Sequence, residues 1–446
     1  GSARASPSRL IFNAPKSMCQ AGGRGGPPRP RPLAVNISTP GATGPTSCRV
    51  RDFDIILAGG GLAAGLIAMR LADVRPGISV AIIDGGERIG GDHIWSRFDS
   101  DLRGPQLKWT QELYAHRWQD GYEVRFPAYS RTLSTPYASV RSERLDAAVR
   151  ARLPAEAIIT GRRIDAVTPT LVRMAGGDVL QAGAVIDCRG QRSSPHLKLA
   201  WQKFVGLELE TARPHGITRP VIMDARVDQL DGYRFVYVLP FSETGLLVED
   251  TYYSDGPDLS EQQVLARVRD YVAGMGLGDV TEGRTESGVL PLALDGDIEA
   301  YWAEDDVPKA GMAAALFNPI TGYSFADAVA TADMVKSLSR VDAAPLYRSL
   351  RDHSISTWKE RGFYRLLNRM MFEAATPQGR YRTLQHFYRM DEDLVERFYA
   401  AQSTAADKAR ILSGKPPVSL PKAVGVLSRS IPKISWRPRW RAREEE

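Results

Sequence analysis

The chain has 446 residues, of which 43% are hydrophobic and 25% charged, and its formal net charge is +6. This length can supply two or three structural units, and the composition excludes a fibrous or wholly disordered protein. No apolar run reaches the roughly 18–20 residues of a membrane-spanning helix, so any membrane contact is expected to be peripheral. The three cysteines and six histidines show neither a disulfide framework nor metal-ligand spacing, which predicts a reducing compartment and no bound metal.

Residues 1–50 differ in composition from the rest of the chain. They are rich in Pro, Gly, Arg and Ser and contain no Asp or Glu. This composition predicts a disordered tail or an expression scar. An organellar transit peptide is the weaker alternative, because glycine and proline do not suit an amphipathic targeting helix.

A glycine-rich turn follows the first strongly apolar run, Phe53–Ala58. The turn reads Gly59-Gly-Gly61-Leu62-Ala63-Ala64-Gly65, which predicts a buried strand, a tight turn and a helix start. Gly59 permits the sharp turn, Gly61 lets the backbone approach a pyrophosphate, and a small residue at Ala64 or Gly65 allows close helix packing. The helix N-terminus offers free N–H groups to the anion.

Two later features favour dinucleotide binding over the alternative of a plain structural turn. Asp84 closes a second apolar strand, Val80–Ile83, where a ribose hydroxyl needs an acceptor. The loop Gly90-Gly91-Asp92-His93-Ile94-Trp95-Ser96 could run beneath such a cofactor, with an ordinary surface loop as the alternative.

The middle of the chain alternates like strands. A strand over 121–126 and a helix over 142–153 precede short strands at 157–190, which are expected to return to the central parallel sheet. Residues 204–288 predict a separate sheet. On the strand at 245–253, Leu246, Val248 and Asp250 should share one face and Glu249 the other. A carboxylate among apolar residues could act as a general acid, and an exposed strand-end acid is the alternative.

The last third predicts a second turn at the same crevice. Residues 311–324 predict a strand, a turn over Pro319–Gly322 and a helix that runs to about Leu338. Residues 344–411 predict helices whose apolar stripes are either core or a wall for a greasy substrate. The segment 422–443 combines Arg and Lys with Trp436 and Trp440, which suits an anionic lipid surface; a solvated tail and nucleic acid are alternatives.

Several motifs together resemble the bacterial lycopene β-cyclase family over about residues 52–418. They are Gly59-x-Gly61-Leu62-Ala63-x-Gly65, Gly90-Gly91-x-His93-x-Trp95-Ser96, Gly232-Tyr-Arg-Phe-Val-Tyr, Glu249-Asp250-Thr, Phe317-x-Pro319-x-Thr-Gly322-Tyr323-Ser324 and Arg410-Ile-Leu-Ser-Gly-Lys-Pro-Pro.

The resemblance implies an α/β fold of the para-hydroxybenzoate-hydroxylase type. Its Rossmann-type FAD-binding domain would be discontinuous, over 51–200 and 285–343, with a β-sheet substrate domain at 201–284. Helices would follow at 344–420 and a basic tail at 421–446.

The resemblance also implies an activity. Lycopene would be cyclised to γ-carotene and then β-carotene, without net redox change, by an enzyme that needs reduced FAD and NAD(P)H as reductant. The implied partners are lycopene, γ-carotene and a lipid surface, with no nucleic acid, in a cytoplasmic, peripherally membrane-associated protein of open oligomeric state. The alternatives are a flavin monooxygenase or polyprenyl reductase, or a non-enzymatic isoprenoid-binding protein.

The family motifs place the site on this sequence as follows. Glu249 and Asp250 would be catalytic, with the proton coming either from Glu249 or from the flavin. The expected cofactor-binding residues are Gly59, Gly61, Leu62, Ala63, Ala64, Asp84, Gly91, His93, Gly311, Pro319, Gly322 and Tyr323. Related flavoproteins carry Gly-Asp where this chain has Ala310-Gly311, so backbone groups around Pro319–Tyr323 would hold the flavin there.

Overall fold

The computed structural model describes residues 52–413, 422, 423, 425 and 426. The expectations for residues 1–50 and for most of the basic C-terminal tail lie outside these residues. The described elements begin with the predicted strand and helix on either side of the glycine-rich turn, β1 (Phe53–Ala58) and α1 (Leu62–Val74).

The first sheet is built around β1. Its strand order is β8-β2-β1-β11-β10-β9, and β1 pairs in parallel with both β2 and β11. Ile55 and Leu57 face a core shared with α1 and α6 (Phe325–Ser337), whereas Ile56 and Ala58 face the opposite core. The predicted return of the chain to the parallel sheet through β11 is confirmed. The other strands are β2 (Val80–Ile83), β8 (Ile158–Ile159), β9 (Ile164–Thr168), β10 (Leu171–Met174) and β11 (Val179–Asp187).

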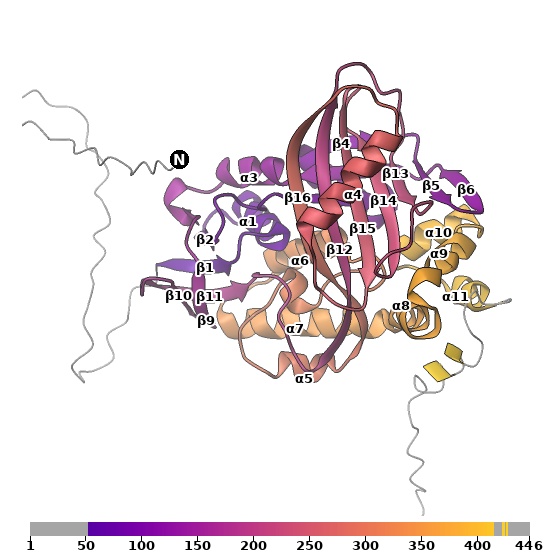
Figure 1. Ribbon diagram of the computed structural model, residues 1–446. Coiled ribbons are helices and arrows are strands. Elements are labelled where there is room, and N and C mark those ends of the chain that lie inside the picture. Colours follow the sequence, from indigo (N-terminus) through magenta and orange to yellow (C-terminus); the bar gives the residue numbers. More distant parts are fainter. Residues whose placement is uncertain (1–51, 414–421, 424, 427–446) are drawn as a thin grey trace, which may run out of the picture. The chain divides into compact units, whose positions relative to one another are not determined.

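The second sheet has seven strands in the order β16-β12-β15-β14-β13-β5-β6. Its strands are β5 (Tyr122–Phe126), β6 (Tyr129–Leu133), β12 (Leu197–Thr211), β13 (Val221–Asp224), β14 (Tyr233–Pro240), β15 (Gly245–Ser254) and β16 (Val280–Gly296). The sheet therefore extends beyond the predicted segment 201–284 and includes an earlier hairpin. The helix α4 (Glu261–Gly274) covers one face (Figure 1), where Val268 and Val272 pack against apolar residues of the strands.

A third, antiparallel sheet has three strands. It consists of β3 (Ile94–Phe98), β7 (Tyr137–Arg141) and β4 (Tyr114–Trp118) in that order. The remaining α-helices among the described residues are α2 (Gly104–Thr110), α3 (Ser142–Arg150), α5 (Ile298–Trp302), α7 (Ala343–Glu360), α8 (Gly362–Arg369), α9 (Tyr381–Phe387), α10 (Glu392–Tyr399) and α11 (Ala405–Leu412).

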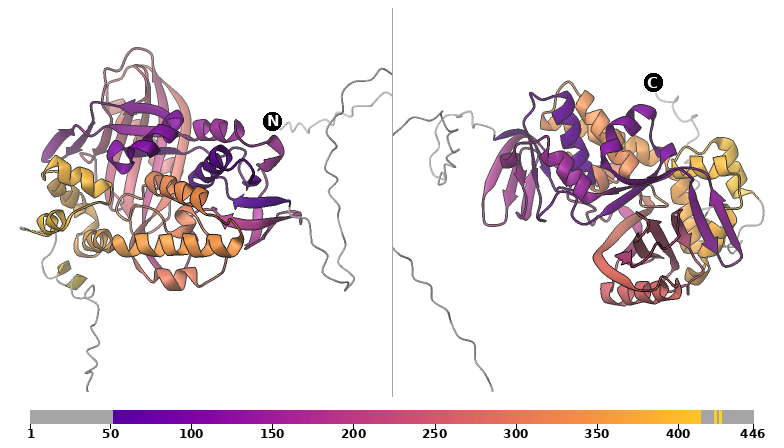
Figure 2. Two further views of the ribbon diagram at one scale, coloured as in Figure 1. Left: turned by 180° about the vertical axis from the view of Figure 1, so that it is seen from behind. Right: turned by 90° about the horizontal axis from the view of Figure 1, so that it is seen from above.

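The C-terminal helices lie beside the β5–β6 hairpin, as the views in Figures 1 and 2 agree. Arg131 of β6 donates a hydrogen bond to the backbone oxygen of Tyr388 at 3.0 Å, and Ser134 donates to Glu392 at 2.7 Å. These contacts connect segments more than 250 residues apart in the sequence. The predicted helical region at 344–411 is confirmed and forms part of the core beneath the second sheet.

One local prediction was wrong. Residues 311–314 form a short 3-10 helix, Gly311–Ala314, and not a strand. Gly311 and Ala315, at its two ends, have φ angles of +61° and +56°, which no extended strand allows. The run of small residues without β-branched side chains gives little strand preference, so the close approach to α1 decides the conformation. The helix that follows, α6, begins where the sequence predicts.

Candidate active site

The turn between β1 and α1 forms a cradle for an anionic group. Gly59 has a φ of +100°, and a Cβ atom there would lie 2.8 Å from backbone atoms of Cys188 and Arg189. At Gly61, in contrast, a Cβ would meet no protein atom within 4 Å. The α1 N-terminus has no side-chain cap, so the amides of its first turn are left for a ligand. The turn therefore fits a pyrophosphate that approaches at Gly61.

Asp84 supports this turn from the end of β2. One of its carboxylate oxygens accepts a hydrogen bond from the Gly60 amide at 2.6 Å, and the other accepts from the Gly86 amide at 2.7 Å. The residue also lines the cavity described next. Its position at the carboxyl end of a parallel strand fits the predicted contact with a ribose hydroxyl.

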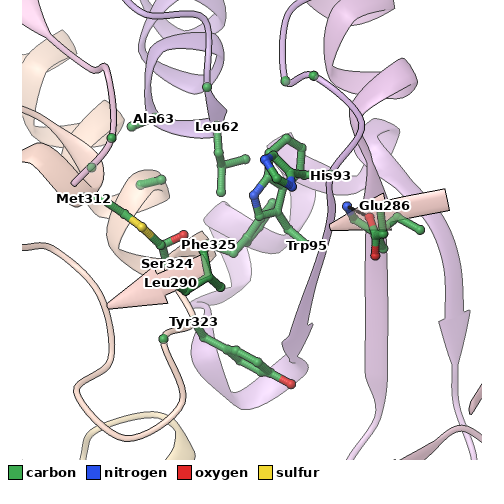
Figure 3. Close-up of a pocket in the computed structure, with 18 of the residues that line it drawn as sticks. Leu62, Ala63, His93, Trp95, Glu286, Leu290, Met312, Tyr323, Ser324 and Phe325 are labelled. Atoms are coloured by element: carbon green, nitrogen blue, oxygen red, sulfur yellow. Dashed lines mark hydrogen bonds between the residues drawn. The ribbon is translucent and has the colours of Figure 1, made fainter. Parts of the chain in front are cut away.

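A cavity of about 560 Å³ runs from this cradle to the second sheet. Figure 3 shows Leu62 and Ala63 at the start of α1, His93 and Trp95 opposite them, and Tyr323 at the other end. The wall toward the second sheet is mainly apolar and aromatic and carries two carboxyl groups; it comprises Phe204, Tyr237, Leu239, Leu247, Glu249, Glu286 and Leu290.

The cavity residues fit a flavin dinucleotide. The cradle lies at one end, and the apolar wall at the other would suit an aromatic ring system. Gln202 also lines the cavity, and its buried Oε1 accepts no hydrogen bond within the described part of the chain. A buried amide oxygen without a partner is costly, which is consistent with a bound group that donates to it.

The loop 90–96 forms one side of the cavity. The backbone turns at Gly90, where a Cβ atom would lie 2.9 Å from the Trp95 ring. His93 and Trp95 have their ring centroids 6.1 Å apart, and both line the cavity together with Gly91. The last three residues of this segment belong to β3, which begins at Ile94; the Ile94 backbone N–H donates to Glu286 Oε2 at 2.9 Å. The segment is therefore part of the cavity wall and not a surface loop without a role.

The turn 319–323 closes the cavity on the side of α6. Asn318 caps it, because its side-chain oxygen accepts the Ile320 amide at 2.9 Å. Gly322 adopts a φ of +68° and lines the cavity beside Tyr323. The buried Asn368 side chain donates to the backbone oxygen of Pro319 and fixes the turn from outside.

Three tyrosine hydroxyls meet at this end of the cavity. The Tyr323 hydroxyl lies 3.0 Å from that of Tyr137 and 3.3 Å from that of Tyr237. Each tyrosine comes from a different segment: the turn before α6, β7 and β14. Burial raises the pKa of Tyr137, Tyr237 and Tyr323, so all three stay neutral.

Glu249 and Asp250 point to opposite faces of β15, as the alternation predicts. Glu249 lines the cavity and accepts a hydrogen bond from the Thr251 hydroxyl at 2.7 Å. Burial raises its pKa to about 7. Asp250 is fully buried on the other face, where it accepts from Arg234 Nε at 2.9 Å and from the Tyr252 hydroxyl at 2.8 Å. The structure therefore places Glu249, but not Asp250, on the wall of the cavity.

Most of the predicted site residues line this cavity, but three do not. Asp250 is the first, for the reason just given. The Ala64 side chain packs in the core beneath α1, leaving only its first-turn amide toward the cradle. Pro319 is buried behind the turn that Gly322 and Tyr323 present.

Sequence reasoning missed Glu286, Tyr137 and Tyr237. Glu286 lies on β16, just past the predicted end of the substrate domain at residue 284 and within the residues 204–288 predicted to form a sheet, but its place beside the site was not predicted. Its signal was indirect: Gly206 sits in the interior of an apolar strand, and such a glycine often marks a close approach of neighbouring groups.

Comparison with known proteins decides the family. The model of the family described as lycopene cyclase protein matches residues 54–424. The chain is 45% identical over 371 residues to a lycopene β-cyclase of Pseudescherichia vulneris, covering 83% of this chain and 96% of that protein. It is 44% identical to a lycopene β-cyclase of a Paracoccus strain, covering 84% and 97%. The chain belongs to the lycopene cyclase family.

A solved structure supports the fold assignment. The flavin-dependent brominase Bmp2 superposes with a TM-score of 0.56 at 13% identity, covering 84% of this chain and 99% of that one. Similarity at this level concerns the fold alone. The fold is that of the flavin-dependent hydroxylases and reductases, as the sequence predicts.

Two further features of the described residues concern membranes and metals. Among these residues, no helix is long and apolar enough to cross a membrane. Nor do they contain a group of three or more His, Cys, Asp or Glu side chains arranged to hold a metal ion.

Proposed function

We propose that the protein converts the acyclic end groups of lycopene to β-rings, forming γ-carotene and then β-carotene. The observation that carries the proposal is the position of Glu249. Its carboxyl group lies in a largely apolar cavity, next to a cradle for a flavin dinucleotide, in a member of the lycopene cyclase family. An enzyme that protonates a hydrocarbon needs an acid in such surroundings, because an alkene is a very weak base.

Glu249 supplies the proton in this proposal. Its raised pKa keeps a population protonated near neutral pH, and Thr251 fixes the carboxyl against β15. Protonation at C2 of the end group creates a cation at C1, and the C5=C6 double bond attacks it. Loss of the C6 proton then completes the β-ring. Electrons are neither gained nor lost by the substrate.

The surrounding side chains protect the cation. Phe204, Leu247 and Leu290 give the cavity an apolar lining. Once lycopene fills the cavity, this lining would keep out water, which would otherwise capture the cation as an alcohol. The neutral rings of Tyr237 and Tyr323 present aromatic surface without a basic oxygen, and aromatic faces attract cations. These residues therefore favour ring closure over hydration.

FAD fits the cradle through the α1 amides, Gly61 and Asp84. In its reduced form, maintained by NAD(P)H, FAD held by these residues would supply negative charge that stabilises the developing cation. The fold of the chain and the open space at Gly61 support this choice of cofactor.

The substrate also argues for a membrane surface. Lycopene is a hydrocarbon of forty carbons and dissolves in lipid, so the protein must take it from a bilayer. We propose that the basic and aromatic residues at 422–443 attach the protein peripherally to anionic lipid. Liposome pull-downs at rising salt test this point: binding that ignores salt and anionic lipid would contradict it.

Expression in a lycopene-accumulating host tests the proposed function. Pigment analysis should show β-carotene and transient γ-carotene. The purified protein in lycopene-loaded liposomes should form rings without stoichiometric consumption of NAD(P)H once the flavin is reduced. Unchanged lycopene in the host, or one NAD(P)H consumed for each ring, would contradict the proposal.

A further inference from the structure

A second buried carboxyl group faces Glu249 across the second sheet. Strand β12 runs between β15 and β16, and its Gly206 is paired with Glu249 on one side and with Glu286 on the other. The three residues thus form one row across the sheet, on the face that lines the cavity. Glu286 is only 5% exposed, and it is the carboxyl to which Ile94 donates.

The glycine in the middle of the row is what lets the two carboxyls meet. Neighbouring strands lie about 4.8 Å apart, so β15 and β16 are separated by roughly 10 Å at this point. Two glutamate side chains can span that gap only over a residue without a side chain. A Cβ atom on Gly206 would lie 3.1 Å from Glu286 Cγ and 3.4 Å from Glu286 Oε1. The Glu286 carboxyl therefore occupies the space above Gly206, on the cavity face that it shares with Glu249.

The surroundings of the two carboxyls favour a shared proton. Thr251 donates to Glu249 Oε1, and the Ile94 amide donates to Glu286 Oε2. Ionised carboxylates only accept hydrogen bonds, so a bond between the two carboxyls needs a proton on one of them. Two carboxylates this close cannot both be ionised without strong repulsion.

The charged groups packed around the pair do not neutralise it directly. Arg284, two residues before Glu286, lowers the pKa of Glu286, but its guanidinium bonds Glu143 and Glu208. Asp250 raises the pKa of Glu249 from the opposite face of β15, where Arg234 holds it.

The remaining titratable groups that face the pair are His93, Tyr137 and Tyr237. Burial raises the pKa of both tyrosines and lowers that of His93, so all three are uncharged near neutral pH. Burial also raises the pKa of Glu249 and Glu286, and the negative charge of Glu249 raises that of Glu286 further.

We propose that Glu286 is a positioning residue that shares one proton with Glu249 across Gly206 and thereby keeps Glu249 supplied as the acid of ring closure. This inference rests on the proposed function. The pair gives its proton to C2 of the end group, the C1–C6 bond forms from the C5=C6 electrons, and the cation moves to C5. The C6 proton then returns to the pair as the C5=C6 bond re-forms. One proton leaves the pair and one comes back in each cycle.

The test compares the pH–rate profiles of variants. In Glu286→Gln, Glu249 ionises without a negatively charged neighbour at position 286, and the new amide N–H can stabilise the ionised Glu249. The alkaline limb of its pH–rate profile should therefore lie at least one pH unit below that of wild type. In Glu286→Asp the alkaline limb should lie between the two. Glu282→Gln is the matched control, because Glu282 lies on the same strand but is exposed and pairs with Arg269. A Glu286→Gln profile that superimposes on the wild-type profile would overturn the proposal.

Infrared spectroscopy gives a readout that does not depend on cyclisation. The wild-type protein should retain a protonated-carboxyl band at pH 8, and the band should weaken in both Glu249→Gln and Glu286→Gln but not in Glu282→Gln. A band that persists in either single variant would overturn the shared proton. If the wild-type protein formed no rings yet showed this behaviour, the proposed function would fail while the carboxyl pair stood.

Discussion

Arg234 Nε lies 2.9 Å from Asp250 Oδ1, on the face of β15 opposite to Glu249. Adjacent acids of one motif therefore have different environments. One faces a cavity without a cationic partner of its own, and the other is held by a buried guanidinium. Because the strand alternates, this division of roles follows from a single peptide step.

Replacement of Glu249 by Gln should abolish ring formation and leave flavin binding intact. The amide preserves the shape and the Thr251 contact but cannot donate a carboxylic proton, so we expect a loss of at least about 100-fold. Product analysis by chromatography and flavin absorbance after gel filtration measure the two quantities. Glu243→Gln, an exposed acid on the loop before β15, is the control. Substantial activity in Glu249→Gln would refute the assigned role.

Replacement of Asp250 by Asn should reduce stability more than chemistry. It removes the carboxylate that pairs with the buried Arg234, and breaking a buried ion pair typically costs about 3–5 kcal/mol. The free energy of unfolding should fall, while the folded fraction keeps most of its turnover per bound flavin. Denaturant titration and flavin-normalised rates check this. A fully stable but inactive Asp250→Asn protein would instead make Asp250 a catalytic group.

The stability of the protein should depend on pH through the two cavity carboxyls. In the folded state the pKa of each carboxyl is raised above its unfolded value, to about 7 for Glu249. The stability that each group contributes is therefore complete below the unfolded pKa near 4.5 and is lost as the pH rises through the folded pKa. Glu286→Gln removes one of them. Relative to wild type, the variant should gain on the order of 1 kcal/mol between pH 5 and pH 8. Thermal unfolding that shows the same stability difference between variant and wild type at both pH values would contradict this.

Side chains added at Gly206 should separate the carboxyl pair in proportion to their size. Gly206→Ala places a methyl group 3.1 Å from Glu286 Cγ, a contact that a small shift relieves. Gly206→Val fills the space between the two acids, so the alkaline limb of its pH–rate profile should resemble that of Glu286→Gln. Infrared titration of both variants provides the measurement. The same protonated-carboxyl band in the valine variant as in wild type would show that the acids do not meet over Gly206.

The two ends of the glycine turn should respond differently to alanine. At Gly59 a methyl group meets backbone at 2.8 Å and the φ of +100° is strained, so Gly59→Ala should destabilise the fold by about 2 kcal/mol or more. At Gly61 the space is free of protein, so Gly61→Ala should fold normally and lose at least about 10-fold in flavin affinity. Thermal unfolding and flavin titration separate the effects. Unchanged flavin affinity in Gly61→Ala would contradict the cradle.

Those elements of the fold that depend on local pattern could be predicted from the sequence. The turn at Gly59–Gly61 and the alternation around Glu249 are decided within a few residues, and both were predicted correctly. The 3-10 helix at Gly311–Ala314 was not, because no local pattern signals its left-handed ends or the close approach of Gly311 to Ala63 of α1.

The part of the site that could not be predicted depends on pairings between distant strands. Glu286 meets Glu249 only through the register of β15, β12 and β16, and β16 is separated from β15 by a helix and a loop. Tyr137 reaches the cavity through a sheet that the sequence did not indicate. The spacing of motifs along the sequence does not indicate the register between distant strands. Gly206, inside an apolar strand, indicates only that neighbouring groups approach closely there.

The three hydroxyls of Tyr137, Tyr237 and Tyr323 come from segments whose sequence separations reach 186 residues. Through the Tyr323 hydroxyl, the turn before α6 is linked to both β7 and β14 at this end of the cavity. A ligand that fills it should slow hydrogen exchange in β7, β14 and the start of α6 together. A ligand in the cavity should therefore make these three segments unfold more cooperatively, through the same three tyrosine side chains.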